Sequence, residues 1–269
     1  MQKQLLWPEF VGVWKYRNFI VAAVSRDFSQ RYKRSFLGAI WAVLNPLSMV
    51  IVYTLVFSNL MQGRLFEDAS ANAYSTYLIA GLLPWGLFAE IISRGQMMFL
   101  DNGNLLKKSA FPKLCLPAIL VIGALQNFTI VFCLFLLGLL LQGEFKGLIV
   151  IAIVPVLLVQ IFLAAGAAIL LATLNVFFRD VIQLTAIMLQ FTFWLTPITY
   201  TMNIIPNDYQ WIFSLNPLLP IFTAYQTIMV RGLQPDWWSL APSLLVAGLI
   251  NILAWAILRA RFNEIVDEV

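Results

Sequence analysis

The feature that most constrains the fold is an uncharged run that begins at Ser35 and lasts until Arg64. It directly follows three cations within residues 31–34. A helix of roughly 20 apolar residues crosses the roughly 30 Å hydrocarbon core of a bilayer. Lys and Arg beside such a helix stay preferentially on the cytoplasmic side. The run therefore predicts a membrane-spanning helix over about 36–61, with the chain before it in the cytosol.

Composition extends this prediction to the whole chain. Hydrophobic residues make up 61% of its 269 residues and charged residues 11%, and several uncharged runs exceed 20 residues. This combination indicates an all-α polytopic membrane protein and excludes a soluble domain. The formal charge of +4 is too small to indicate a nucleic-acid partner.

Two absences exclude classes of chemistry. The chain has no histidine, so His-based metal sites, proton relays and Ser-His nucleophilic centres are excluded. It also has no phosphate-binding GxxxxGK(S/T) loop. Cys115 and Cys133 stand 18 residues apart on one predicted helix, about 27 Å along its axis, and cannot bridge each other. We expect no catalytic residue, metal or cofactor in this chain, and a separate protein must supply any energy.

Charge and breaker residues predict the topology. An amphipathic helix within residues 1–30 is expected to lie at the inner interface, ahead of a membrane domain over 31–269. A lipid-exposed break at Asn216 and Pro217 would strand backbone groups in hydrocarbon, so 204–230 is predicted to be a pair of re-entrant helices with both ends external. Cytosolic segments then hold thirteen Lys and Arg and external ones three, which favours both termini inside. The six predicted spans cover about 36–61, 74–100, 114–141, 148–176, 181–200 and 238–258.

Two of these spans carry a stripe of polar and aromatic side chains. At 100° per residue, the members of each stripe share one helix face. Embedded amide side chains are costly unless they meet water or a polar partner. Each stripe therefore either packs on another helix or lines a path, and both interpretations stay open. The first span contributes Trp41, Asn45, Ser48 and Asn59, and the fifth contributes Gln183, Gln190, Trp194 and Thr201, with Pro197 bending its outer end.

Two local patterns in other spans predict contacts. Glu90 precedes Arg94 by four residues, the spacing of a helical ion pair. We interpret them as a pair that neutralises itself, in preference to an ion-coupling site. In the fourth span, Ala164, Ala168 and Ala172 form a ridge of small side chains suited to close helix contact.

The cytosolic loop between the second and third spans contains apolar residues beside its lysines and a predicted short helix. Lysines alone would keep this loop on the cytoplasmic side. Its apolar residues need another reason, so we expect another protein to dock there. Arg179 and Asp180 mark a tight turn between the fourth and fifth spans, either as punctuation or as a second docking point. The docking candidates in the larger loop are Leu105, Leu106, Lys107, Lys108, Phe111 and Lys113.

Five sequence blocks, each weak alone, together resemble the membrane subunits of type-2 ABC exporters of lipid-linked polysaccharide, the family that serves O-antigen, capsule and teichoic-acid export. The resemblance covers the whole chain. The blocks are RYKRSFLGAIWAVLNPL from Arg31, LLKKSAFPKLCLP from Leu105, NVFFRD from Asn175, LTPITY from Leu195 and LNPLLP from Leu215.

The resemblance implies a homodimer of six-span subunits in the bacterial inner membrane, docked on two copies of a cytosolic ATPase that binds ATP and Mg. It implies an N-terminal interface helix and a channel walled by the first and fifth spans of both subunits. The implied substrate is a lipid-linked O-antigen-type polysaccharide, exported from the cytosol, and membrane lipids are the remaining partner. Re-entrant gate helices follow the fifth span, with Pro197, Tyr200, Asn216, Pro217 and Pro220 as external gate candidates.

The chemistry of the stripes suits a carbohydrate path. Pyranose rings present apolar faces that pack on aromatic rings, and hydroxyls that bind Asn, Gln, Ser or Thr. Trp41 and Trp194 stand on the polar stripes, whereas other tryptophans are expected in the interfacial belts. One alternative is an ABC exporter of capsule, teichoic acid, a drug or a lipid. Another is an ion-coupled secondary transporter or channel, for which Glu90 and Arg94 are the only ionisable candidates.

Overall fold

The computed structural model of the chain describes residues 12–32, 73–107 and 112–269, together with the isolated positions 40, 41, 44, 48 and 51. Every regular element in this described part is a helix, which confirms the all-α expectation. Four helical stretches there are long and apolar enough to cross a membrane: Ala73–Gly95, Cys115–Leu141, Gly147–Phe177 and Trp238–Glu268. The expected first span, about 36–61, falls almost wholly outside the described residues.

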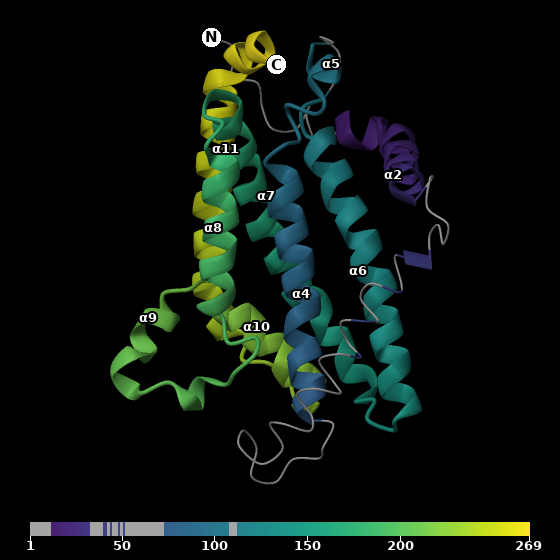
Figure 1. The fold of residues 1–269 in the computed structure, drawn as a ribbon, viewed down its shortest axis with the longest axis vertical. Helices are drawn as coiled ribbons and strands as arrows, with labels where there is room; N and C mark the ends of the chain where they lie inside the picture. The colour runs from purple at the N-terminus through teal and green to yellow at the C-terminus, as the bar shows by residue number, and fades with distance from the viewer. Residues whose placement is uncertain are drawn as a thin grey trace.

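Most of the long helices of the described part run along the long axis of the molecule (Figure 1). Short links between successive helices make neighbours antiparallel. The helix α5 (Gly103–Leu106) lies at one end of the bundle, which we call the α5 end, and α10 (Leu219–Gln226) lies toward the other, the α10 end. The helices along this axis are α4 (Ala73–Gly95), α6 (Cys115–Leu141), α7 (Ile153–Phe177), α8 (Val181–Trp194) and α11 (Ala241–Glu268).

The helix α7 lies at the centre of the packing, against α11 and α4. Its three ridge alanines, Ala164, Ala168 and Ala172, are each 0% exposed. A methyl group added at Gly95 of α4 would come within 2.5 Å of the Ala168 Cβ, so the two backbones approach as closely as small residues allow. The close helix contact predicted from the ridge is therefore confirmed.

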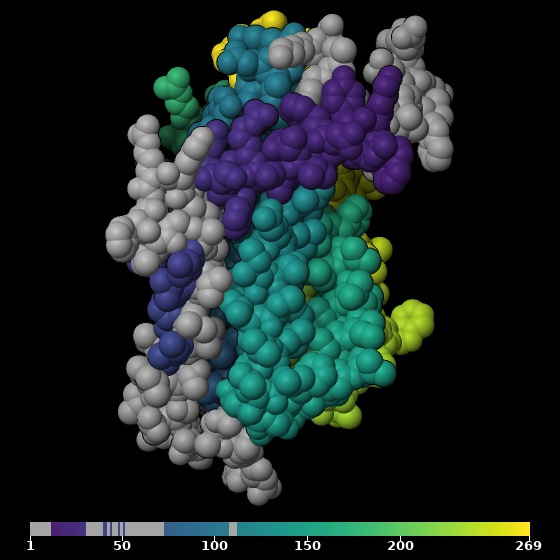
Figure 2. Space-filling model, turned by 90° about the vertical axis from the view of Figure 1, so that its right-hand side faces the viewer, coloured from purple at the N-terminus to yellow at the C-terminus, as the bar shows by residue number. Residues whose placement is uncertain are grey.

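The helix α2 (Arg17–Tyr32) lies across the α5 end of α6 (Figure 2). Ile20 and Val24 pack there against Cys115, and all three side chains are buried. Trp14 and Val21 are exposed at 73% and 64%. One apolar stripe therefore fixes α2 to the bundle, while other apolar side chains stay free for the surroundings. The part of the expected N-terminal helix before residue 12 lies outside the described residues.

The helix α8 ends at Trp194, six residues before the predicted end of the fifth span. Proline has no backbone N–H, and the residue before it is disfavoured in the helical region. Thr196 and Pro197 therefore stop the helix, whereas Pro197 was expected only to bend it. As a correction, Thr201 follows a non-helical stretch and is not part of the helical stripe formed by Gln183, Gln190 and Trp194.

The segment after this break consists of short helical pieces. The 3-10 helices η3 (Met202–Ile204) and η4 (Asn207–Tyr209) lead into α9 (Gln210–Ser214), and the π-helix η5 (Thr227–Arg231) extends α10. Between α9 and α10, residues 215–218 are not helical, because Pro217 lacks a backbone N–H donor. Two short helices separated at Asn216 and Pro217 are thus present, as the breaker residues indicated.

Two further 3-10 helices precede long helices, and the last helix ends well beyond its predicted bound. The helices η2 (Gly147–Ala152) and η6 (Trp238–Leu240) lead directly into α7 and α11. The last helix continues to Glu268, ten residues beyond the predicted end of its span. Arg259 lies within it, with its guanidinium 4.9 Å from the centre of the Trp255 ring.

Candidate functional site

At the α10 end, the non-helical stretch after α8 is held by side chains from α4 and α10. The Tyr77 hydroxyl lies 3.0 Å from the Pro197 carbonyl oxygen and 2.8 Å from that of Tyr200. The amide of Gln226 donates to the same Pro197 carbonyl at 2.9 Å. A carbonyl that has lost its helical partner must find another donor when it is buried, and Tyr77 and Gln226 supply these donors.

The same stretch makes further bonds of this kind. The Tyr74 hydroxyl donates to the Thr199 carbonyl at 2.9 Å. The Asn216 amide donates to the Leu195 carbonyl at 3.1 Å and to the Thr196 hydroxyl at 2.8 Å. Segments far apart in sequence therefore meet around the end of α8.

These contacts locate the external gate candidates relative to one another. Pro197, Tyr200 and Asn216 lie together around the end of α8, and the Tyr200 hydroxyl donates to the Trp194 carbonyl. Pro217 is linked instead to the last helix, because its carbonyl accepts from the Ser243 hydroxyl at 2.7 Å. Pro220 lies in the first turn of α10.

The predicted stripe on α8 faces outward. Gln183 and Gln190 are exposed, and Trp194 is 57% exposed, while the opposite side buries Val181 and Thr185. An exposed face that combines two amides with large apolar side chains suits neither lipid nor water alone. This face is therefore available to a second protein chain or to a passing molecule.

The stripe on the first span, the other predicted wall of the path, is described only in part. Trp41 is 40% exposed and Ser48 is also exposed. Asn45 and Asn59 lie outside the described residues. The open choice between packing and a path therefore stands for both stripes.

At the α5 end, the docking candidates divide by exposure. Lys107 is exposed and Leu105 half-buried, but Leu106 is only 5% exposed and packs into the protein's own core. As a correction, Leu106 is therefore unsuitable as a contact for another protein. Lys113 lies with its ammonium 3.4 Å from the centre of the Phe262 ring. Lys108 and Phe111 are outside the described residues.

The turn between α7 and α8 presents an exposed surface at the same end. Arg179 and Asp180 are both exposed. Phe178, directly before them, is 63% exposed and was not among the residues predicted to dock. A solvent-facing phenylalanine beside a cation and an anion is a typical protein contact, so Phe178 is added to the docking candidates. The sequence signal that could have indicated Phe178 was an apolar residue directly before the predicted turn.

An ion network ties three helices together. Arg94 pairs with Glu90 at 2.9 Å, as the four-residue spacing predicted. Arg94 also pairs with Asp27 of α2 at 2.6 Å, and the Asn127 amide of α6 donates to Glu90 at 2.9 Å. The local pair is confirmed, while Asp27 and Asn127 were missed because spacing carries no signal for partners this distant.

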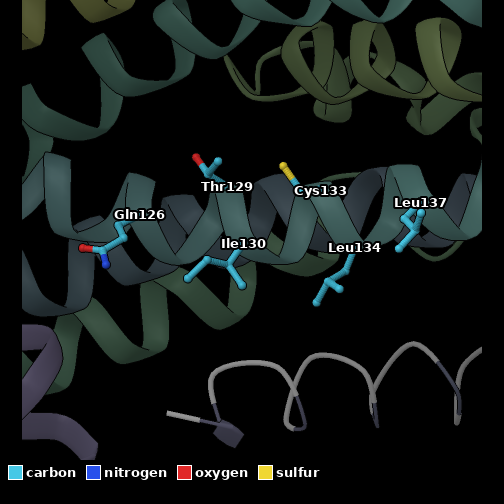
Figure 3. Close-up of a pocket in the computed structure, with 6 residues that line it drawn as sticks. All are labelled: Gln126, Thr129, Ile130, Cys133, Leu134 and Leu137. Atoms are coloured by element: carbon cyan, nitrogen blue, oxygen red, sulfur yellow. The ribbon is translucent and has the colours of Figure 1, made fainter.

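An open groove runs along one face of α6 (Figure 3). Its lining mixes apolar side chains with one amide, one hydroxyl and one thiol. Among the residues that the structure describes, no group of three or more carboxylate or thiol side chains could hold a metal ion. Cys133 lies in the groove and Cys115 lies beneath α2, and the two do not form a disulfide with each other, as their separation required. The lining residues are Gln126, Thr129, Ile130, Cys133, Leu134 and Leu137.

Comparison with known proteins gives one family and several relatives. A family model described as ABC-2 type transporter matches residues 18–230. The O-antigen export system permease protein RfbA of Myxococcus xanthus is 29% identical over 262 residues, which cover 96% of this chain and 97% of that protein. A protein of the same name from Klebsiella pneumoniae is 28% identical over 254 residues, 92% and 95% of the two chains. The polysialic acid transport protein KpsM of Escherichia coli is 22% identical over 217 residues, 79% and 81%.

Proposed function

Since the chain belongs to the ABC-2 type transporter family, we propose that it is the membrane subunit of an ATP-driven exporter that carries a lipid-linked O-antigen-type polysaccharide out of the cytosol. The observation that carries this proposal is nearly full-length similarity to permeases named for O-antigen export. The protein is thus proposed to form the passage, and its partner to supply the energy.

The family implies a cytosolic ATPase partner. We propose two copies of that ATPase, each with its own ATP and Mg, on a homodimer of this chain. The exposed surface at the α5 end, with Lys107, Phe178, Arg179 and Asp180, supports a docking site there. The uncovered face of α8 supports a second copy of the chain on the far side of a polar path, because glutamines inside a membrane need water or a polar partner.

The path is proposed to run between the α8 faces and first spans of the two subunits. Gln183 and Gln190 offer hydrogen bonds to sugar hydroxyls, and Trp194 offers a flat apolar surface to pyranose faces. Many weak contacts of this kind hold a polymer without stopping its movement. The corresponding residues of the first span are Trp41, Asn45, Ser48 and Asn59.

We propose six spans in the bacterial inner membrane with the α5 end in the cytosol. Of the cations that the structure describes, Lys107, Lys113 and Arg179 lie at the α5 end, whereas Lys146 and Arg231 lie at the other. This distribution supports the orientation, since cations favour the cytoplasmic side. In this arrangement α2 lies at the inner interface, and residues 204–230 dip into the membrane from outside.

The topology predicts the accessibility of single cysteines. In a variant with Cys115 and Cys133 replaced by alanine, cysteines at positions 208 and 231 should both react with an impermeant thiol reagent added to intact spheroplasts. A cysteine at position 261 should react only after the membrane is opened. If positions 208 and 231 label from opposite sides, residues 204–230 cross the membrane and the re-entrant arrangement is wrong.

A variant at the α7–α8 turn tests the function and the docking site together. We expect Phe178→Asp to lose the ATPase on co-purification and to abolish surface polysaccharide, because a carboxylate cannot replace an apolar contact. Tyr209→Asp is the matched control, since Tyr209 is an exposed aromatic at the other end and should retain the ATPase. Full recovery of the ATPase with Phe178→Asp would move the docking site elsewhere, and wild-type protein that supports no polymer export would contradict the proposed function.

The polysialic acid transport relative favours a second candidate substrate, an acidic polysaccharide. The two candidates differ in the polymer that accumulates inside cells when the chain is deleted. The ion-coupled alternative loses its support, because Glu90 and Arg94 are engaged with each other and with Asn127 and Asp27.

A further inference from the structure

The break after α8 is stabilised in large part by side chains that donate hydrogen bonds to backbone carbonyls. Within 195–200, the Leu195 carbonyl accepts from Asn216, and the Thr199 carbonyl accepts from Tyr74. The Pro197 carbonyl lies within hydrogen-bond distance of Gln226 and Tyr77, and the Tyr200 carbonyl within that of Tyr77. Irregular backbone inside a membrane protein needs such donors, since no bulk water replaces them. The position of this segment therefore depends on a few identifiable hydrogen bonds.

Tyr77 links this segment to α4. A hydroxyl carries a single hydrogen and donates to one acceptor at a time. The Tyr77 hydroxyl lies closer to the Tyr200 carbonyl, at 2.8 Å, than to the Pro197 carbonyl, at 3.0 Å. Since Pro197 also has Gln226 as a donor at 2.9 Å, we assign the Tyr77 hydrogen to Tyr200. The Tyr200 hydroxyl in turn donates to the carbonyl of Trp194. A continuous chain of contacts thus leads from α4 to Trp194 at the end of the proposed path.

We propose that Tyr77 and Gln226 are positioning residues that hold the segment 195–200 and thereby fix Trp194 at the outer mouth of the polymer path. The expected effect on export rests on the proposed function. The hydrogen bonds that hold the segment 195–200 do not depend on which substrate is exported. Neither side chain touches polymer. Both act through the segment that carries Trp194.

The chain provides a matched control for the loss of one hydroxyl. Tyr225 lies in α10, one residue before Gln226, and its side chain is 1% exposed. Its hydroxyl has no hydrogen-bond partner among the residues that the structure describes. Tyr77→Phe and Tyr225→Phe therefore remove the same atom from buried tyrosines at the same end of the bundle, and only the first removes a donor to the 195–200 segment.

The test measures how readily this segment moves. Ile198 is 0% exposed, so Ile198→Cys, in full-length protein without Cys115 and Cys133, is labelled only when the segment opens and reports on its movement. In lipid nanodiscs, we expect Tyr77→Phe to raise the labelling rate by a small hydrophilic maleimide roughly tenfold, the change that follows from losing about 1.4 kcal/mol. Tyr225→Phe should leave the rate unchanged. Equal rates in the two variants would overturn the proposal, because a merely structural loss lowers the melting temperature without selectively exposing position 198.

A second variant keeps the test informative if Tyr77→Phe folds poorly. Gln226→Met keeps the side-chain length but removes the donor to Pro197, and we expect the same rise in labelling. Surface polymer should fall in both variants while recovery of the complex stays constant. Unchanged labelling with lost export would overturn the positioning role and leave the proposed function intact. If labelling rises in the variants but the wild-type protein exports no polymer, the proposed function is contradicted and the positioning role is not.

Discussion

Replacing Gly95 by alanine is expected to destabilise the protein by about 1 to 3 kcal/mol, the usual cost of forcing an extra methyl group into a packed interior. The added Cβ would lie 2.5 Å from the Ala168 Cβ, 3.0 Å from the Leu120 Cδ2 and 3.3 Å from the Ala168 Cα. The last of these is a backbone atom and cannot rotate away. The helices α4 and α7 must therefore separate, which loosens the central contact of the bundle.

Gly86 provides the control on the same helix. Among the described residues, no atom outside its own helix backbone and chain neighbours lies within 4 Å of a Cβ added at this position. Because alanine has a higher helix propensity than glycine, Gly86→Ala should raise stability by up to about 1 kcal/mol. Thermal unfolding of the two purified variants in detergent should therefore shift in opposite directions from the wild type. A shift of the same sign in both would mean that the α4–α7 approach is not tight.

The sequence predicted the helices best where charges bound an uncharged run. The expected 114–141 corresponds to α6 at Cys115–Leu141, and the expected 148–176 corresponds to Gly147–Phe177. Hydrophobicity did not reveal the end of α8, since Leu195 and Ile198 continue the apolar run past the break. What makes the break stable is the set of donors on α4 and α10, and these are tertiary contacts without a local pattern.

The same distinction holds for the candidate site. Helix geometry alone fixes a contact four residues away, so the Glu90–Arg94 pair could be predicted. Asp27 lies 67 residues from Arg94, and no periodicity links the two positions. Leu106 shows the converse error, because an apolar residue between lysines in a loop resembles a docking contact. The fold instead buries it, and only the packing of α5 against the bundle reveals this.

The outward stripe of α8 calls for an experiment that separates a path from a dimer contact. We expect Trp194→Ala to lower surface polysaccharide roughly three- to tenfold, as follows from losing about 1 kcal/mol of contact between the indole and each passing sugar ring. Gln190→Ala should act in the same direction. Trp238→Ala is the control, since Trp238 is 86% exposed at the start of the last helix and lies off the proposed path.

Recovery of the intact dimer decides between the two roles of Trp194. Within one chain the side chain is 57% exposed, so its truncation removes little packing from the subunit itself. If a second copy buried it, truncation would cost about 3 to 5 kcal/mol, as for tryptophans in protein cores, and the dimer would dissociate on purification. We expect the dimer and its ATPase to be recovered at wild-type levels while export falls. Dimer loss in step with export would assign Trp194 to the subunit interface, and normal export would remove it from the path.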